Sequence, residues 1–151
     1  MKKFIITVLI AILIGYIYGK IVFNQYDKKL EKVFNQTETL YFLQQGVYSN
    51  KENVLKYANK INYYLVIKDD DFYRVYVGIT KNKNNINKIK EIYTNSGNEI
   101  YVREIASSNA GFFEVLNQYD MLLESVEGEN QILQIQKQVL SKYEELVINN
   151  E

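Results

Sequence analysis

Residues 72–78, Phe72-Tyr73-Arg74-Val75-Tyr76-Val77-Gly78, form the clearest strand signal in the sequence. Almost every position is β-branched or aromatic, and such residues favour a pleated strand. Because side chains alternate along a strand, Val75 and Val77 share one face, and Arg74 and Tyr76 share the other. The segment therefore predicts a sheet with an apolar face for packing and a polar face opposite.

Strand and helix patterns alternate on both sides of this segment. Strands are predicted at 41–46 and 64–68, followed by a polar turn at Asp69-Asp70-Asp71, and a last strand is predicted at 100–105. The order is βαββαβ, an α+β plan of the ferredoxin-like (split βαβ) type with a four-stranded antiparallel sheet. Right-handed crossovers would place both helices on one face and leave the other uncovered.

Two amphipathic helices lie between these strands. Ser49 and Glu52 have the spacing of a capping box, which predicts that the first helix begins there. Its apolar side comprises Val54, Leu55, Ala58 and Ile61. The second helix runs from about 81 to 95, with its stripe at Ile86, Ile89, Ile92 and Tyr93, and a stop at Ser96-Gly97-Asn98.

The N-terminus has the pattern of a membrane anchor. Residues 4–23 are nearly all apolar, and as a helix they would extend about 30 Å, the thickness of a hydrocarbon core. The lysines in residues 1–3 favour a short cytoplasmic tip, which sends the rest of the chain outside the cytoplasmic membrane. A cleaved signal peptide is the alternative, although a small-x-small cleavage site is lacking. Residues 24–40 are predicted to form a helical juxtamembrane stalk.

Residues 107–151 are predicted to form a helical extension. Apolar residues recur in steps of three and four on both sides of Gly128, which predicts a helical hairpin turning there or one long helix weakened there. This wide apolar face needs a covering surface, either within the hairpin, on the sheet domain, or on a protein partner or second copy. The residues expected at such a surface are Phe112, Leu116, Tyr119, Leu123, Ile132, Val139 and Leu146.

Composition excludes many kinds of chemistry. The 151 residues include no histidine and no cysteine, which removes the commonest general base, the commonest metal ligand and any thiolate site. Basic and acidic residues number 18 each, which gives no electrostatic reason to expect nucleic acid. A glycosidase needs two carboxylates flanking one bond, and the strands of the expected binding face offer only Glu104. We therefore expect no enzyme activity, no metal and no cofactor.

Two blocks of sequence resemble the SPOR domain, the small peptidoglycan-binding module of bacterial division and sporulation proteins. The first is Gln44-Gln45-Gly46-Val47-Tyr48-Ser49, which runs into a helix that starts with Asn50-Lys51-Glu52-Asn53. The second is Tyr73-Arg74-Val75-Tyr76-Val77-Gly78, similar to the family's third strand. The resemblance covers residues 41–106 and extends neither to the anchor nor to the C-terminal helices.

The resemblance implies recognition of glycan strands stripped of their peptide stems, bound on the uncovered sheet face. The glycan-binding residues expected from it and from strand alternation are Gln44, Tyr48, Ser49, Arg74 and Tyr76. Three positions depart from the family pattern, and one of them is Ile79, which replaces a frequent proline after the strand glycine. Val47 replaces a small polar residue, and Gln45 stands where an apolar, helix-facing residue is usual and would need a buried partner.

The sequence thus predicts a membrane-anchored, non-catalytic peptidoglycan-binding protein of division or sporulation sites. The alternative is a membrane-tethered scaffold that acts through its C-terminal hairpin.

Overall fold

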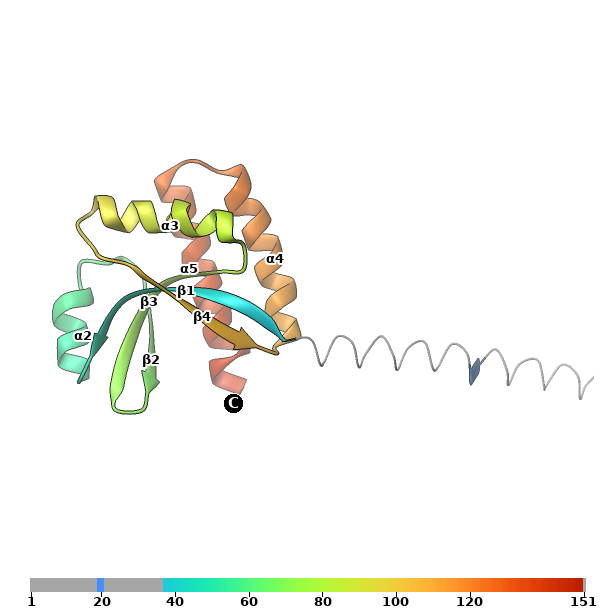
Figure 1. Ribbon diagram of the computed structural model, residues 1–151, viewed down its shortest axis with the longest axis horizontal. Coiled ribbons are helices and arrows are strands. Elements are labelled where there is room, and N and C mark those ends of the chain that lie inside the picture. The colour runs from blue at the N-terminus through green and yellow to red at the C-terminus, as the bar shows by residue number, and fades with distance from the viewer. Residues whose placement is uncertain (1–18, 21–36, 151) are drawn as a thin grey trace, which may run out of the picture. The chain divides into compact units, whose positions relative to one another are not determined.

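The computed structural model describes residues 19–20 and 37–150. Four strands and four α-helices follow one another along residues 37–150, and a short 3₁₀ turn ends them (Figure 1). The elements are β1 (Glu38–Tyr48), α2 (Lys51–Ala58), β2 (Leu65–Asp69), β3 (Phe72–Thr80), α3 (Lys83–Asn95), β4 (Tyr101–Ser107), α4 (Ala110–Ser125), α5 (Glu129–Leu146) and the 3₁₀ turn Ile148–Asn150. The predicted βαββαβ order over the first six elements is confirmed.

The four strands form one antiparallel sheet in the order β2-β3-β1-β4. In the β1–β3 ladder the pairing shifts on both sides of Gln44, which leaves Gln45 and Val77 without direct partners. These irregularities keep Gln44 opposite Tyr76 and Val47 opposite Arg74. As a result, Gln44 of β1 lies on the same face of the sheet as Arg74 and Tyr76 of β3.

Helices α2 and α3 cover the opposite face, as predicted. Val75 packs with Val54 and Ala58 of α2, whereas Val77 packs with Ile89 and Tyr93 of α3. Helix α3 ends as predicted before Gly97, whose φ of +79° is readily adopted only by glycine.

Three local expectations were wrong. Residues 38–40, expected at the end of a helical stalk, belong to β1, because the fully buried Leu40 places this part of the strand in the core. The N-cap of α2 is Asn50, which accepts a hydrogen bond from the Asn53 amide at 2.9 Å, rather than Ser49. Leu55, expected on the packed side of α2, is 64% exposed.

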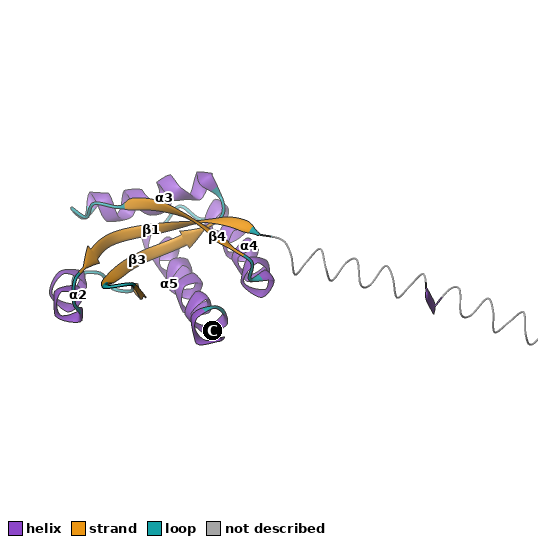
Figure 2. Ribbon diagram, turned by 60° about the horizontal axis from the view of Figure 1, so that its bottom comes forward, coloured by secondary structure: helices purple, strands orange, loops and turns teal. Residues whose placement is uncertain are grey.

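The C-terminal segment is a hairpin of α4 and α5, and it packs on the sheet. Figure 2 shows most of α4 and α5 on the side of the strands away from α3, whereas the connected end of the hairpin reaches α3, where Leu123 and Ile132 pack with Ile89. Phe42 and Tyr76 of the sheet make edge-to-face ring contacts, and Tyr143 of α5 contacts both Phe42 and Phe112 in the same way. The expectation of an uncovered sheet face is therefore wrong for the half of the face that lies under the hairpin.

Burial of the hairpin's apolar stripe also corrects the expected partner surface. Of the seven residues proposed for it, five are at most 3% exposed inside the chain: Phe112, Leu116, Leu123, Ile132 and Val139. They pack on Leu40, Phe42 and Leu43 in the two main core clusters. The stripe is thus core of this domain and is not free for a partner.

Polar contacts of buried side chains fix the hairpin to the end of β3 and to the start of α3. Asp120 of α4 accepts hydrogen bonds from the Thr80 hydroxyl, from the Lys81 amide at 2.9 Å and from the Asn85 side chain at 3.0 Å. Gln136 of α5 accepts a bond from the Ile79 amide at 2.9 Å. Ile79 lies on the part of β3 that extends beyond β2, so Gln136 satisfies a backbone donor that no neighbouring strand reaches.

Residues 37–150 belong to one compact unit, so no boundary separates the sheet from the helices that follow residue 106. Within the described part of the chain, none of the helices combines the length and apolar character that crossing a membrane requires. The expected anchor at 4–23 lies outside the described residues except for Gly19 and Lys20.

Candidate sheet-face site

Five polar side chains meet on the half of the sheet face that the hairpin leaves uncovered. They come from all four strands, and we call them the arginine cluster: Gln44, Asp69, Arg74, Tyr76 and Arg103. Arg74 donates from Nε to Oδ2 of Asp69 at 2.5 Å and from Nη1 to Oε1 of Gln44 at 3.4 Å. Arg103 Nη1 lies 3.1 Å from the Tyr76 hydroxyl and 3.5 Å from the same Asp69 oxygen.

The electrostatics of the cluster favour an ionised Asp69 and a neutral Tyr76. The hydrogen bond from Arg74 is the main cause that lowers the pKa of Asp69, with a further contribution from Arg103. Burial raises the pKa of Tyr76 in spite of the nearby Arg103. At neutral pH the cluster therefore holds two positive charges against one negative charge.

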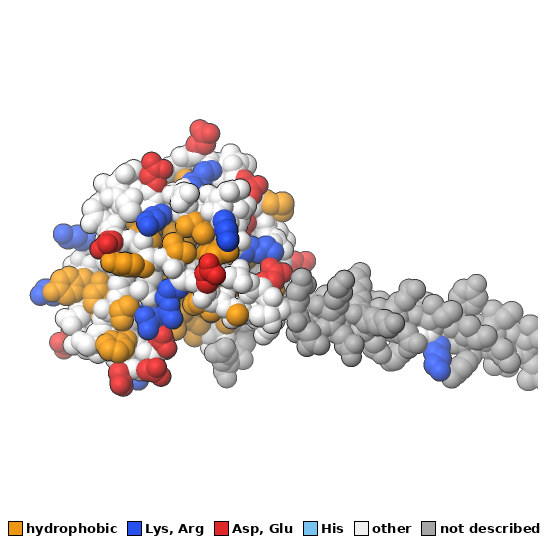
Figure 3. Space-filling view, in the orientation of Figure 1, with side chains coloured by type: hydrophobic (Ala, Val, Ile, Leu, Met, Phe, Trp, Pro, Cys, Tyr) orange, Lys and Arg blue, Asp and Glu red, His pale blue; other side chains and the backbone are white. Residues whose placement is uncertain are grey.

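Three apolar side chains border the arginine cluster on the same face. Val47 lies opposite Arg74 in the ladder, Tyr101 lies opposite Gln44, and Phe72 precedes Arg74 by two positions. They are 41%, 53% and 47% exposed, so together they add apolar surface beside the charged groups. Figure 3 shows basic and hydrophobic side chains side by side on the surface over the strands. The site thus combines charged donors with exposed apolar surfaces.

Three of the five residues expected from the sequence lie together in this cluster. Gln44 and Tyr76 are only 7% and 2% exposed, and each contacts an arginine of the cluster through a polar atom, Gln44 with Arg74 and Tyr76 with Arg103. Arg74, with 23% of its side chain exposed, connects Gln44 to Asp69.

Tyr48 does not join the site. It belongs to the small core between α2 and the helix-covered face, and its ring stacks on Tyr57 with centroids 5.9 Å apart. Ser49 follows β1 and is exposed, beyond the strand register that assembles the cluster. The expectation that Tyr48 faces the binding surface was wrong, because the ladder irregularity at Gln45 shifts the alternation beyond it.

Two of the three departures from the family pattern, Gln45 and Val47, have distinct structural roles. Gln45 is half-buried, and its Oε1 accepts a hydrogen bond from the Tyr48 hydroxyl at 2.9 Å. This bond supplies the partner that its polar side chain needs. Val47 lies on the same face as the arginine cluster, where it adds apolar surface next to Arg74.

Asp69 and Arg103 are members of the cluster that sequence reasoning missed. Asp69 was interpreted as a turn residue, but it is the last residue of β2 and faces the site. Arg103 lies opposite Phe42 in the β1–β4 ladder, which places it on the same face as Gln44. The alternation along the last strand shows that Tyr101, Arg103 and Ile105 share a face. Which face of the sheet this is depends on the pairing of β4 with β1, which only the folded sheet shows.

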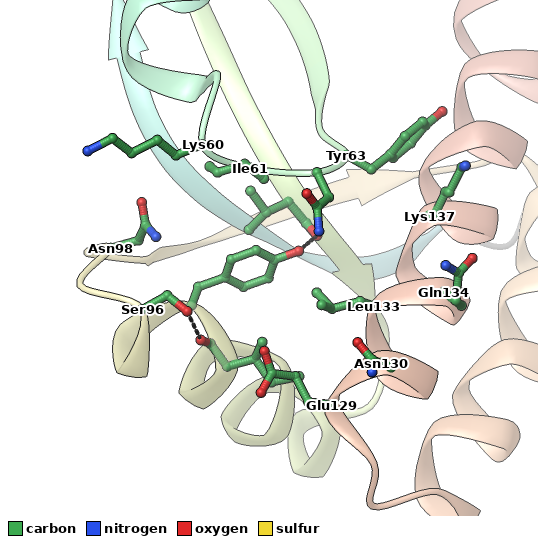
Figure 4. Close-up of a pocket in the computed structure, with 14 residues that line it drawn as sticks. Lys60, Ile61, Tyr63, Ser96, Asn98, Glu129, Asn130, Leu133, Gln134 and Lys137 are labelled. Atoms are coloured by element: carbon green, nitrogen blue, oxygen red, sulfur yellow. Dashed lines mark hydrogen bonds between the residues drawn. The ribbon is translucent and has the colours of Figure 1, made fainter.

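A cavity of about 350 Å³ lies elsewhere, between the α2–β2 connection, α3 and α5 (Figure 4). Its floor includes Tyr93, whose hydroxyl donates to the Val77 carbonyl at 3.2 Å. Lys137 at its rim lies 5.5 Å from the centre of the Tyr63 ring. The cavity therefore has an apolar floor and a polar rim, and its buried hydroxyl already has a partner.

The chemistry of the arginine cluster is suited to binding. Its single carboxylate is held by two guanidinium groups, which makes it a poor base. Glu104 pairs with Tyr41 in the ladder and so faces away from Gln44 and Arg103. In the described ranges, no group of three or more acidic side chains is placed to hold a metal ion.

No family model matches the chain, and a comparison with curated proteins found no match. Among solved structures, the chain is similar to the peptidoglycan-binding domain of the Bacillus subtilis cell wall lytic enzyme CwlC. The identity is 24%, the match covers 47% of this chain and 95% of that domain, and the TM-score is 0.41.

Proposed function

We propose that this chain is a membrane-anchored, non-catalytic protein that binds peptidoglycan. The binding surface is the arginine cluster with its apolar border, and the ligand is a glycan strand from which the peptide stems have been removed. The observation that carries the proposal is the convergence of Gln44, Arg74 and Arg103 beside exposed Phe72 and Tyr101.

A glycan suits this combination of groups. Sugar rings have apolar faces that aromatic side chains cover, and their hydroxyl and amide groups bond directionally to guanidinium and side-chain amide groups. The sequence resemblance of residues 41–106 to SPOR domains favours wall glycan over other sugars. That resemblance also supports a role at division or sporulation sites.

The anchor is supported by the sequence. The apolar run at 4–23 has the length of a membrane span, and Lys2 and Lys3 favour an N-terminus inside the cytoplasmic membrane. This orientation would place residues 37–151 outside that membrane, where peptidoglycan is.

Co-sedimentation with purified sacculi tests the proposal. The full chain, kept in solution with a mild detergent, is mixed with sacculi before and after an amidase has removed the stem peptides. We expect stronger pelleting with the stripped sacculi. Gln44→Ala and Arg74→Ala should each weaken it at least tenfold, because each removes one of the polar groups of the site.

Lys68→Ala is the matched control. Lys68 is an exposed cation on the same β-hairpin as Arg74, but it pairs with Tyr73 and faces the opposite side of the sheet. The Lys68→Ala variant loses one positive charge, as Arg74→Ala does, but it should leave pelleting unchanged. Equal losses for Lys68→Ala and Arg74→Ala would contradict a site on this face, and an absence of pelleting with either preparation would overturn the proposal.

A further inference from the structure

We infer that the arginine cluster recognises a carboxylate on its sugar ligand, and that Arg103 is the residue that binds it. This inference rests on the proposed function and adds the chemical group that distinguishes the ligand. It also assigns a binding role to a residue outside the family motif.

The cluster has unused donors as well as an excess of positive charge. Asp69 interacts with Nε of Arg74 and with Nη1 of Arg103. Nε and Nη2 of Arg103, and Nη2 of Arg74, have no partner within the part of the chain that the structure describes. Two guanidinium groups and one carboxylate give the cluster a net charge of +1, which one bound anion would neutralise.

Arg103 is better placed than Arg74 to meet a ligand. Its side chain is 39% exposed, against 23% for Arg74. Both of its contacts use Nη1, and an Nε/Nη2 edge is the fork that binds the two oxygens of a carboxylate. The bond to the Tyr76 hydroxyl and the attraction of Asp69 hold the guanidinium over the sheet, so less side-chain freedom is lost on binding.

The surroundings indicate that the carboxylate belongs to a sugar. Tyr101 lies two positions before Arg103 on the same face of β4, and 53% of it is exposed. An aromatic surface next to an anion-binding fork suits a ring with an acidic substituent. Gln44 supplies an amide for the ring's hydroxyl or acetamido groups.

Stripping creates such a group in peptidoglycan. The stem peptide is joined by an amide to the lactyl group of N-acetylmuramic acid. Hydrolysis adds water across that bond, releases the peptide amine and leaves the lactyl carboxylate on the glycan. The lactyl carboxylate thus appears only on stripped strands, which would let Arg103 distinguish them from strands that still carry peptides.

The test uses the full chain and three forms of one sacculus preparation. The forms are intact, amidase-stripped, and stripped with the new carboxylates then converted to methylamides. We expect pelleting to fall at least tenfold from the second form to the third. In a further arm, hyaluronan, a polymer of uronic acid and N-acetylglucosamine, competes with the stripped sacculi for the protein. The hyaluronan concentration needed to reduce pelleting separates a site for acidic sugars in general from a site for muramic acid.

Two variants assign the effect to Arg103. Arg103→Gln should bind stripped and methylamidated sacculi equally, since it keeps polar contacts but loses the cation. Lys68→Gln should keep the full tenfold preference. Thermal unfolding of each variant checks that it is folded. Carboxylate recognition itself is tested by the binding of the unaltered chain to the three sacculus forms, so that test does not depend on any variant.

The outcomes separate this inference from the proposed function. Equal binding of the unaltered chain to stripped and methylamidated sacculi would overturn carboxylate recognition and leave glycan binding in place. A retained tenfold preference in Arg103→Gln would overturn the role of Arg103. A lack of binding to every form of sacculus would overturn the proposed function itself.

Discussion

Asp69 and Arg103 lie on the two opposite edge strands of the sheet, yet Oδ2 of Asp69 is 3.5 Å from Nη1 of Arg103. The two central strands separate β2 from β4, so this approach requires the long Arg103 side chain to extend across the face towards the short Asp69 side chain. Arg74 contacts the same Asp69 oxygen from β3, and Tyr76 contacts Arg103. A single carboxylate thus links contributions from both edges of the sheet, and it orients the donors proposed to meet the glycan.

Replacing Arg74 should raise the pKa of Asp69. The hydrogen bond from Arg74 is the largest cause of the lowered pKa, so in Arg74→Gln this pKa should return towards its ordinary value of 3.8. Arg103→Gln should cause a smaller rise. The measurement is an NMR pH titration of the Asp69 side-chain carboxyl.

The lowered pKa of Asp69 also predicts how the free energy of unfolding changes with pH. Because the folded-state pKa is lowered, the contribution of Asp69 is present above its ordinary value of 3.8 and is lost as the pH falls through the lowered pKa. Arg74→Gln should reduce this acid dependence. Lys68→Gln should not alter the Asp69 pKa, because Lys68 faces the other side of the sheet. An Asp69 pKa that is unchanged in Arg74→Gln would show that the ion pair does not form in solution.

Gly78→Ala should destabilise the fold, because two helices approach this residue closely. A Cβ there would lie 2.8 Å from Oε1 of Gln136 and 3.1 Å from a methyl carbon of Ile89. Gln136 is buried, and that oxygen holds the Ile79 amide, so moving it breaks a buried hydrogen bond. We expect a loss of about 1–3 kcal/mol in the free energy of unfolding, measured by urea denaturation.

A double-mutant cycle tests this explanation. Gln136→Ala is itself destabilising, but it removes the group that the new methyl would meet. The two losses should therefore add to more than the loss measured in the double variant. Gly111→Ala is the control, since its Cβ would meet only one atom, Asn109 Oδ1, at 3.5 Å, and the residue is helical. Strict additivity of Gly78→Ala and Gln136→Ala would contradict the proposed contact.

The sequence was informative about local structure because its signals are local. Alternation at 72–78 and helical stripes at 50–61 and 81–95 identify elements without knowledge of their neighbours. The short β2–β3 turn and the right-handed crossover rule then limit the topology to the one observed. The stripe through Phe112 and Leu116 also predicted correctly that α4 needed a covering surface.

Long-range placement was beyond sequence reasoning. Periodicity shows that α4 and α5 are amphipathic, but it does not show that they cover Phe42 and Tyr76. Their packing there converted an open face into a half-covered one. Tyr48 was misplaced because one irregularity at Gln45 reverses the face of every later residue in the strand. Arg103 was missed because its direction depends on pairing with Phe42.

Tyr93 should make the protein less stable at high pH. It is 7% exposed, and burial raises its pKa from 10.0 to about 12. Because the folded-state pKa is raised, the contribution of Tyr93 to stability is fully present below pH 10 and is lost as the pH rises towards 12. The shift of about two units corresponds to about 3 kcal/mol.

Tyr93→Phe isolates this effect. The variant loses the bond to the Val77 carbonyl, which should cost about 1 kcal/mol at neutral pH. Its stability should then fall less than that of the unaltered chain between pH 10 and 12, as measured by denaturant unfolding at each pH. Parallel pH dependence in the two proteins would show that Tyr93 ionises at its ordinary pKa.

Removing the C-terminal hairpin should unfold the sheet, although the SPOR-like resemblance ends at residue 106. Leu40, Phe42, Tyr76 and Ile79 are at most 2% exposed, and all four belong to the core cluster that α4 and α5 complete. Burying a large apolar side chain contributes about 1.5–3 kcal/mol, or about 6–12 kcal/mol for the four. That sum is comparable to the whole stability of a typical domain, about 5–15 kcal/mol.

A chain that ends at Ser107 tests this prediction against one that ends at Ile148. The shorter chain also loses Asp120 and Gln136, which removes one acceptor from the buried Thr80 hydroxyl and leaves the Ile79 amide without its Gln136 partner. It should show no cooperative thermal transition and no dispersed NMR spectrum, whereas the longer one should retain both. A cooperatively folded chain ending at Ser107 would mean that the sheet is independent of the hairpin and that its hairpin-facing side tolerates water.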